Sequence, residues 1–225
     1  GDEIVMPGDP IGPDQIVSSN GLGLAALVTA CGGQPVLLPI ARDNAASLHA
    51  AAEGVRGADL MITTGGASVG DHDLIRDVLG EDGLEIDFWR IAMRPGKPLM
   101  FGAIGGTPVL GLPGNPVSSQ VCALLFTVPA LRVMQGLPLQ ETVTEQALLG
   151  CDLPPNDRRQ DYLRSRLDQD KDGRPVATPF EKQDSSVLSL LAKAECLVVR
   201  PPHAEAAEAG TMVNILRFDP GLVRL

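Results

Sequence analysis

The sequence is poor in positive charge, and this shortage excludes one large class of ligands. Its 225 residues include 18 lysines and arginines against 28 aspartates and glutamates, which gives a formal net charge of −10 at pH 7. Nonspecific binding of nucleic acid needs a basic surface that neutralises phosphates. We therefore expect no nucleic-acid partner, and any anionic ligand must be captured by a local arrangement of residues.

Paired cysteines and long apolar runs are also missing. The four cysteines, at positions 31, 122, 151 and 196, include no CxxC pair and no histidine at zinc-finger spacing, which favours free thiols in a reducing cytoplasm. The longest apolar run, VCALLFTVPALRVM, contains a proline and an arginine and is too short to span a bilayer. The sequence therefore predicts a cytoplasmic protein without a membrane partner.

Strand-like and helix-like segments alternate along the first part of the chain. Short apolar runs that fit strands are PVLLPIA, DLMITT, IDFWRIAM, PLMFGAI and PVLGLP. Helices are expected over SSNGLGLAALVTACGG, after the capping pair Asp43 and Asn44, along DHDLIRDVL, and from Pro116, a residue favoured in a first helical turn. This alternation predicts an α/β domain with a parallel or mixed sheet covered on both faces.

The pattern changes beyond about residue 140. Short alternating pieces such as QDYLRSRL, CLVVRPP and TMVNILRF follow, and Asp172-Gly173 fits a hairpin turn. We expect two domains: an α/β domain over residues 1–140 and a small, β-rich, barrel-like domain over residues 141–225.

Three loops that follow strands carry residues suited to phosphate. They are TTGGASVGDHD at residues 63–73, RPGKP at residues 94–98 and GLPGNPVS at residues 111–118. In open α/β sheets ligands bind beyond the carboxyl ends of strands, where glycines admit the ligand and helix N-termini attract anions. Each loop alone also fits a simpler interpretation, a tight turn with capping residues and solvated surface charges.

The acids of the first loop sharpen this choice. Asp71 and Asp73 would repel a neighbouring phosphate unless a divalent cation such as Mg²⁺ bridged carboxylate and phosphate oxygens. The alternative is that they only stabilise the positive end of the helix dipole. The loop and its acids together suggest a phosphate bound with a metal ion.

A dinucleotide fingerprint provides a competing hypothesis. GLGLAA, residues 21–26, matches GxGxxA and is followed about 20 residues later by Asp43. That motif must directly follow a buried strand, whereas PGDPIGPDQIVSSN, rich in glycine and proline, precedes it here. An NAD-binding oxidoreductase is therefore the weaker alternative.

The order of the motifs GDEI, SSNG, ARDN, TTGGASVGDHD, RPGKP and GLPGNPVS resembles that of MoeA-type molybdopterin molybdenumtransferases, a family that includes the E domain of gephyrin. The resemblance implies a three-layer molybdopterin-binding domain of the MoaB/Mog type, followed by a small β domain. It also implies the reaction: adenylylated molybdopterin is bound, molybdate is inserted at its dithiolene, and AMP is released in a Mg²⁺-dependent step.

The resemblance also implies roles for individual residues. Glu3, Asp43, Asp73 and Lys97 match catalytic positions, and Asp43 and Asp73 are the implied metal ligands. Arginine stands at position 94, where the family often has lysine. The implied cofactor-binding residues are Thr64, Gly65, Gly66, Ser68, Gly70, Arg94, Gly96, Lys97, Pro113, Gly114, Asn115 and Ser118.

Partners follow from the same resemblance, namely a second copy in a full-length homodimer and a MogA-type adenylyltransferase. The chain starts without methionine and without the further domains that precede GDE in the family. We therefore expect an amino-terminal truncation with weak or no molybdate insertion. The alternative is a non-catalytic molybdopterin-binding or scaffold fragment, since gephyrin's E domain also anchors receptor peptides.

Overall fold

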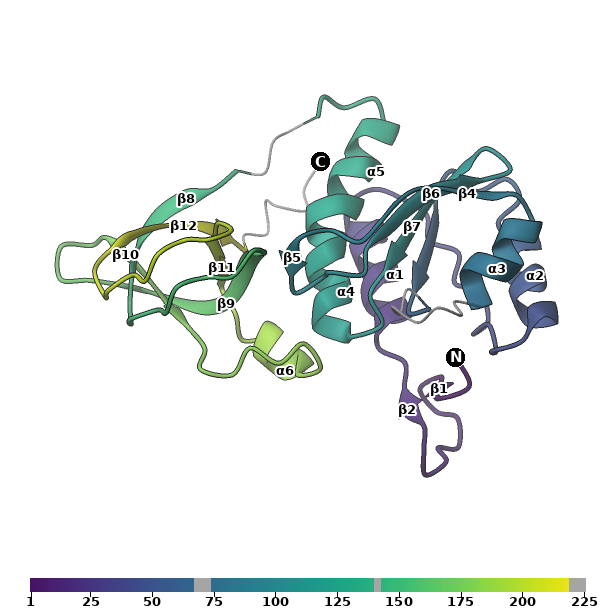
Figure 1. Ribbon diagram of the computed structural model, residues 1–225, viewed down its shortest axis with the longest axis horizontal. Coiled ribbons are helices and arrows are strands. Elements are labelled where there is room, and N and C mark those ends of the chain that lie inside the picture. Colours follow the sequence, from purple (N-terminus) through teal and green to yellow (C-terminus); the bar gives the residue numbers. More distant parts are fainter. Residues whose placement is uncertain (67–73, 140–142, 219–225) are drawn as a thin grey trace.

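The computed structural model describes residues 1–66, 74–139 and 143–218, which form an α/β part followed by a small β barrel (Figure 1). A four-stranded mixed sheet lies at the centre of the α/β part. Its strands, in spatial order, are β3 (Met61–Thr64), β7 (Thr107–Leu112), β6 (Met100–Ile104) and β4 (Leu84–Trp89). β3 and β7 are parallel, and the other two pairs are antiparallel. The expected mixed sheet is confirmed.

Helices cover both faces of this sheet (Figure 1). On one side lie α1 (Asn20–Ala30) and a continuous helix made of α4 (Pro116–Cys122), the π-helical turn η1 (Ala123–Thr127) and α5 (Val128–Met134). On the other lie α2 (Ala45–Glu53) and α3 (Leu74–Glu81). Separate apolar clusters fill the two helix–sheet interfaces. The three-layer α/β architecture follows from a sheet that is apolar on both faces.

The helix Pro116–Met134 corrects one expectation. Its 19 residues are long and apolar enough to cross a membrane, so the apolar segment is not too short. Half of it is nevertheless buried inside the protein, and the side chains of Val117, Val121 and Cys122 are at most 1% exposed. Its apolar residues form the core beneath the sheet.

Two expected strands are wrong. The described segment 35–41 contains no strand, and Val36 and Leu37 are 77% and 49% exposed. Pro35 and Pro39 lack the backbone N–H groups that a sheet ladder requires. The run IDFWRIAM is not one strand either, because β4 ends at Trp89 and a separate strand, β5 (Met93–Arg94), follows in another sheet.

The carboxy-terminal part is a closed five-stranded barrel. Its strands are β8 (Glu145–Leu149), β9 (Gln160–Gln169), β10 (Pro175–Pro179), β11 (Cys196–Arg200) and β12 (Met212–Arg217). β10 closes it by pairing with both β8 and β9. The turn between β9 and β10 contains Gly173 at φ 78°, as expected for the Asp172-Gly173 hairpin. The β-rich character of this domain is confirmed.

The barrel and the α/β part share a hydrophobic core. Leu197 of β11 and Leu216 of β12 pack in the same cluster as Val117 and Val121 of the long helix. β5 extends the barrel sheet by pairing with β9, and the short helix α6 (Leu188–Leu191) contacts α4. The expected domain boundary at residues 140 and 141 lies outside the described residues.

A two-stranded parallel ladder forms near the amino terminus, from β1 (Ile4–Val5) and β2 (Ile16–Val17). It projects from the α/β part below α1 in Figure 1.

Candidate functional site

Strand register brings the three glycine-containing loops to one edge of the four-stranded sheet. Thr64 pairs with Leu112, so the carboxyl ends of β3 and β7 lie side by side. Met100, the first residue of β6, lies opposite Gly111 on one side and Trp89 on the other. The connection from β4 to β6, which contains RPGKP, therefore emerges at the same edge. We call residues 64–66, 95–98 and 113–118 the sheet-edge site.

Two of these loops touch through glycine. Gly65 donates its backbone N–H to the Leu112 carbonyl at 3.1 Å, and a β-carbon on Gly114 would stand 3.3 Å from the Gly65 Cα. Gly65 and Gly66 adopt φ values of 81° and 67°, which L-residues with side chains rarely occupy. Glycine thus allows both the turn and the close approach of the two backbones.

The SSNG motif joins the same edge. The Asn20 amide donates a 2.7 Å hydrogen bond to the Gly114 carbonyl. Asn20 Oδ1 is buried and has no partner among the described residues. This side chain ties the start of α1 to the loop that precedes α4.

The barrel domain also reaches this edge, through residues that sequence patterns did not indicate. Asn115 Nδ2 donates to Ser185 Oγ at 2.7 Å, and the Val117 N–H donates to the Ser185 carbonyl at 3.0 Å. Asn115 occupies the N-cap position of α4 without a side-chain cap bond, and its side chain makes this interdomain contact instead. A lone serine in a polar segment gives no sequence signal of such a role.

Arg164 supports that barrel segment from beneath. Its side chain is 1% exposed, and it donates to the Asp184 carbonyl at 2.9 Å and to Gln183 Oε1 at 3.3 Å. Burial lowers the pKa of Arg164 from its usual value, and Asp184 opposes this effect. The residues before Ser185 are therefore held by a buried guanidinium, which the alternating pattern of β9 did not reveal.

The predicted residues on and before α4 differ in accessibility. Gly114 and Asn115 are exposed, whereas Pro113 is buried and Ser118 is 5% exposed. Gly114 and Asn115 can face a ligand at the surface. Pro113 and Ser118 instead contribute to packing beneath it.

The two cations of RPGKP lie in different surroundings. Lys97 is exposed and forms no ion pair or side-chain hydrogen bond with any described residue. Arg94 instead contacts carboxylates of the barrel. Gly96, at φ 119°, leaves no space for a side chain, since a β-carbon there would lie 2.5 Å from Cys122 Sγ. The loop is thus seated on α4 with Lys97 facing outward.

The predicted acids are only partly described. The Asp2 N–H donates to Asp43 Oδ2 at 3.0 Å, so the GDE and ARDN motifs lie together; Glu3 is exposed, and the Asp43 side chain is 61% exposed. Ser68, Gly70 and Asp73 lie outside the described residues. Within residues 1–66, 74–139 and 143–218, no cluster of three or more potential metal ligands occurs. The described residues alone do not fit a Mg²⁺ site.

The dinucleotide fingerprint is wrong in its structural context. Gly21 and Gly23 lie inside helix α1, where a β-carbon on Gly23 would meet the Gln120 side chain at 2.5 Å. The preceding strand β2 has exposed residues and belongs to a separate two-stranded sheet. These glycines serve helix packing, and no strand-to-helix turn is available for a pyrophosphate.

Comparison with known families decides what this arrangement represents. Residues 1–133 match the family described as "Probable molybdopterin binding domain", and residues 146–218 match the "MoeA C-terminal region (domain IV)". The chain belongs to the molybdopterin-binding domain family. The GASVG stretch of this domain, residues 66–70, also fits the GxSxG pattern of serine hydrolases, but the family match favours molybdopterin binding.

Individual relatives agree with this assignment of the molybdopterin-binding domain. The chain is 33% identical over 221 residues to molybdopterin molybdenumtransferase 2 of Mycobacterium tuberculosis, covering 96% of this chain and 54% of that protein. Gephyrin of Dictyostelium discoideum is 32% identical over 185 residues, covering 72% and 26%. The MoeA crystal structure from Pyrococcus horikosii superposes with a TM-score of 0.80 at 32% identity, covering 96% and 52%. The chain thus spans about half the length of the tuberculosis protein and of the MoeA structure.

Proposed function

We propose that the chain is the molybdopterin-binding and carboxy-terminal portion of a molybdopterin molybdenumtransferase, which inserts molybdate into molybdopterin during molybdenum cofactor biosynthesis. The observation that carries this proposal is the convergence of the TTGG, RPGKP and PGNP loops at one sheet edge, in a chain that matches both family regions. The names of the relatives support the reaction class.

The described residues suggest a division of labour at the sheet-edge site. The N–H groups of Gly65 and Val117 already donate to the Leu112 and Ser185 carbonyls, so the Gly66 N–H is a backbone donor that the described part of this edge can offer to the phosphate of molybdopterin. The exposed ammonium of Lys97 adds a positive charge that has no ion-pair partner among the described residues. Asp43 and Glu3 lie on adjoining segments, where they can orient substrate or accept a proton. Fixed donors of this kind stabilise phosphate charge without reorganisation during the reaction.

The finer parts of the proposal are supported by the family resemblance. They are an adenylylated substrate, release of AMP, dependence on Mg²⁺, a homodimer in the full-length protein, an adenylyltransferase partner and a cytoplasmic location. Mg²⁺ would supply charge neutralisation between carboxylate and phosphate oxygens. Because the described acids form no such site, we assign no step to the metal.

Equilibrium binding of molybdopterin tests the proposal. We expect the chain to bind molybdopterin, and Lys97→Ala to weaken binding by about 10-fold, the equivalent of roughly 1.4 kcal/mol. Lys171→Ala is the matched control, because Lys171 is an exposed lysine in the β9–β10 hairpin. Equal effects of the two substitutions would contradict a local phosphate site.

A second readout separates enzyme from scaffold. Asp43→Asn removes the charge but keeps an oxygen that can accept the Asp2 N–H. We expect it to preserve molybdopterin binding and to lower molybdate insertion, measured by reconstitution of an apo-molybdoenzyme with the substitution placed in a chain as long as the tuberculosis relative. Unchanged molybdate insertion by Asp43→Asn would show that the Asp43 carboxylate has no role in the reaction.

A further inference from the structure

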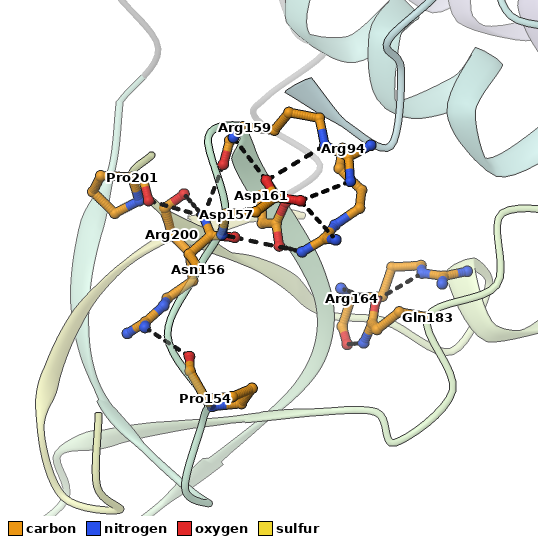
Figure 2. Close-up of polar contacts among 10 residues, drawn as sticks. All are labelled: Arg94, Pro154, Asn156, Asp157, Arg159, Asp161, Arg164, Gln183, Arg200 and Pro201. Atoms are coloured by element: carbon orange, nitrogen blue, oxygen red, sulfur yellow. Dashed lines mark hydrogen bonds and ion pairs between the residues drawn. The ribbon is translucent and has the colours of Figure 1, made fainter. Parts of the chain in front are cut away.

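The Arg94 side chain lies against Asp161 and Asp157 of the barrel domain (Figure 2). Its Nη2 donates to Asp161 Oδ2 and, at 3.4 Å, to Asn156 Oδ1. Its Nη1 lies 3.5 Å from Asp157 Oδ2. The backbone follows the same course, because β5 and β9 pair with Met93 opposite Gln160 and Arg94 opposite Asp161. One residue of the RPGKP loop thus engages both the strand and the side chains of the second domain.

Asp161 depends on this contact. Its side chain is 5% exposed, and its second oxygen, Oδ1, is buried without a partner among the described residues. Arg94 is the cation that pairs with it there. A buried carboxylate that loses its cation is strongly unfavourable, whereas replacing both charges by apolar groups is much better tolerated. The buried Asp161 carboxylate therefore stabilises the conformation in which the Arg94 guanidinium lies against the barrel.

The charge of Arg94 is fully balanced in this position. Asp157 accepts from Arg159 at 2.8 Å as well as lying near Arg94. Two guanidiniums and two carboxylates therefore form one neutral group at the junction of the two domains. Lys97, three residues from Arg94, has no such partner among the described residues.

We propose that Arg94 is an interdomain clasp positioned by Asp161, and that Lys97 is the cation of RPGKP that serves the phosphate. The second half of this inference rests on the proposed function. Arginine suits the clasp because its planar fork can reach several acceptors at once, which an ammonium cannot do in the same way.

A double-mutant cycle tests the clasp without any ligand. Arg94→Met, Asp161→Leu and the double variant are compared with the parent chain by urea denaturation. We expect each single substitution to lower the denaturation midpoint more than the double substitution does, because each single substitution leaves one charged side chain without its partner. Arg94→Lys, which keeps the charge without the fork, should fall between the parent and Arg94→Met. If the losses of stability in the two single variants add up to the loss in the double variant, Arg94 and Asp161 do not interact and the inference is wrong.

Phosphate titration tests the division between the two cations. Inorganic phosphate is added while the amide signals of Gly65, Gly66 and Gly114 are followed by NMR. We expect Arg94→Met/Asp161→Leu to bind phosphate within twofold of the parent chain and Lys97→Met to bind at least fivefold more weakly. Equal weakening by both variants would overturn the inference. The two experiments can also disagree. Non-additive effects of the Arg94 and Asp161 substitutions on stability, together with unchanged phosphate affinity of Lys97→Met, would support the interdomain role of Arg94 and refute the proposed phosphate site.

Discussion

Asn20 and Gly114, 94 positions apart in the chain, are joined by a 2.7 Å hydrogen bond from the side-chain amide to the backbone carbonyl. This bond couples the first turn of α1 to the loop between β7 and α4. The PGNP loop is therefore held from two sides, by Asn20 of the α/β part and by Ser185 of the barrel domain. The loop that would face the proposed ligand is therefore held in place by hydrogen bonds to both domains.

Asn20→Ala should weaken this arrangement. We expect a loss of about 0.5–1.5 kcal/mol in the free energy of unfolding, the usual contribution of one hydrogen bond, together with weaker molybdopterin binding. Urea denaturation and a binding titration check both effects. Gln135→Ala is the control, because Gln135 binds the Cys31 carbonyl at 2.8 Å near the other end of α1. A similar loss of ligand affinity in both variants would show a global effect.

Gly65→Ala should impair binding through the backbone. A residue with a β-carbon at φ 81° is strained by roughly 1–2 kcal/mol, and relief of that strain would reorient the next peptide group, which carries the Gly66 N–H. Gly57→Ala introduces the same strain at φ 84°, with no atom within 4 Å of the new β-carbon. We expect comparable losses in urea midpoint and a loss of molybdopterin affinity for Gly65→Ala alone. Identical affinities would exclude Gly65 from the site.

The cysteines should differ sharply in reactivity. Burial raises the pKa of Cys122 and of Cys196 to about 12 and also raises that of Cys31, whereas Cys151 is half-buried. Thiolates are the reactive species, so at pH 8 Ellman's reagent should modify one thiol rapidly and the other three only after unfolding. Cys151→Ser should abolish the rapid phase. A rapid phase that survived this substitution would contradict the assignment.

Asp157 should titrate at unusually low pH. The Arg159 side chain, followed by its backbone N–H, lowers the pKa of this carboxyl from 3.8 to about 2. Because the folded-state pKa lies below the unfolded value, the stabilisation is present above about pH 4 and is lost as the pH falls toward 2. NMR titration of the Asp157 carboxyl carbon measures the midpoint. Arg159→Met should raise it, and a wild-type midpoint near 3.8 would refute the pairing.

Local patterns predicted several elements correctly because their signals are short-range. Asn44 caps α2 by accepting from the Ser47 N–H at 2.9 Å, and Pro116 stands at the start of the long helix as its fixed φ favours. Leu24 of α1 is buried, and so is Cys31, which directly follows the helix. The apolar segment 35–41 was misassigned because hydrophobicity alone does not supply a strand with neighbours to pair with.

The sequence by itself determined the alternation of helices and strands, the glycines required by its turns, and the acidic balance that disfavours nucleic acid. Only the tertiary structure decided that Arg94 faces the barrel while Lys97 stays exposed, and that Ser185 joins the PGNP loop. The physical reason is that propensity and periodicity act over a few residues. The partner of a side chain, by contrast, depends on which distant strands pair and how their domains pack.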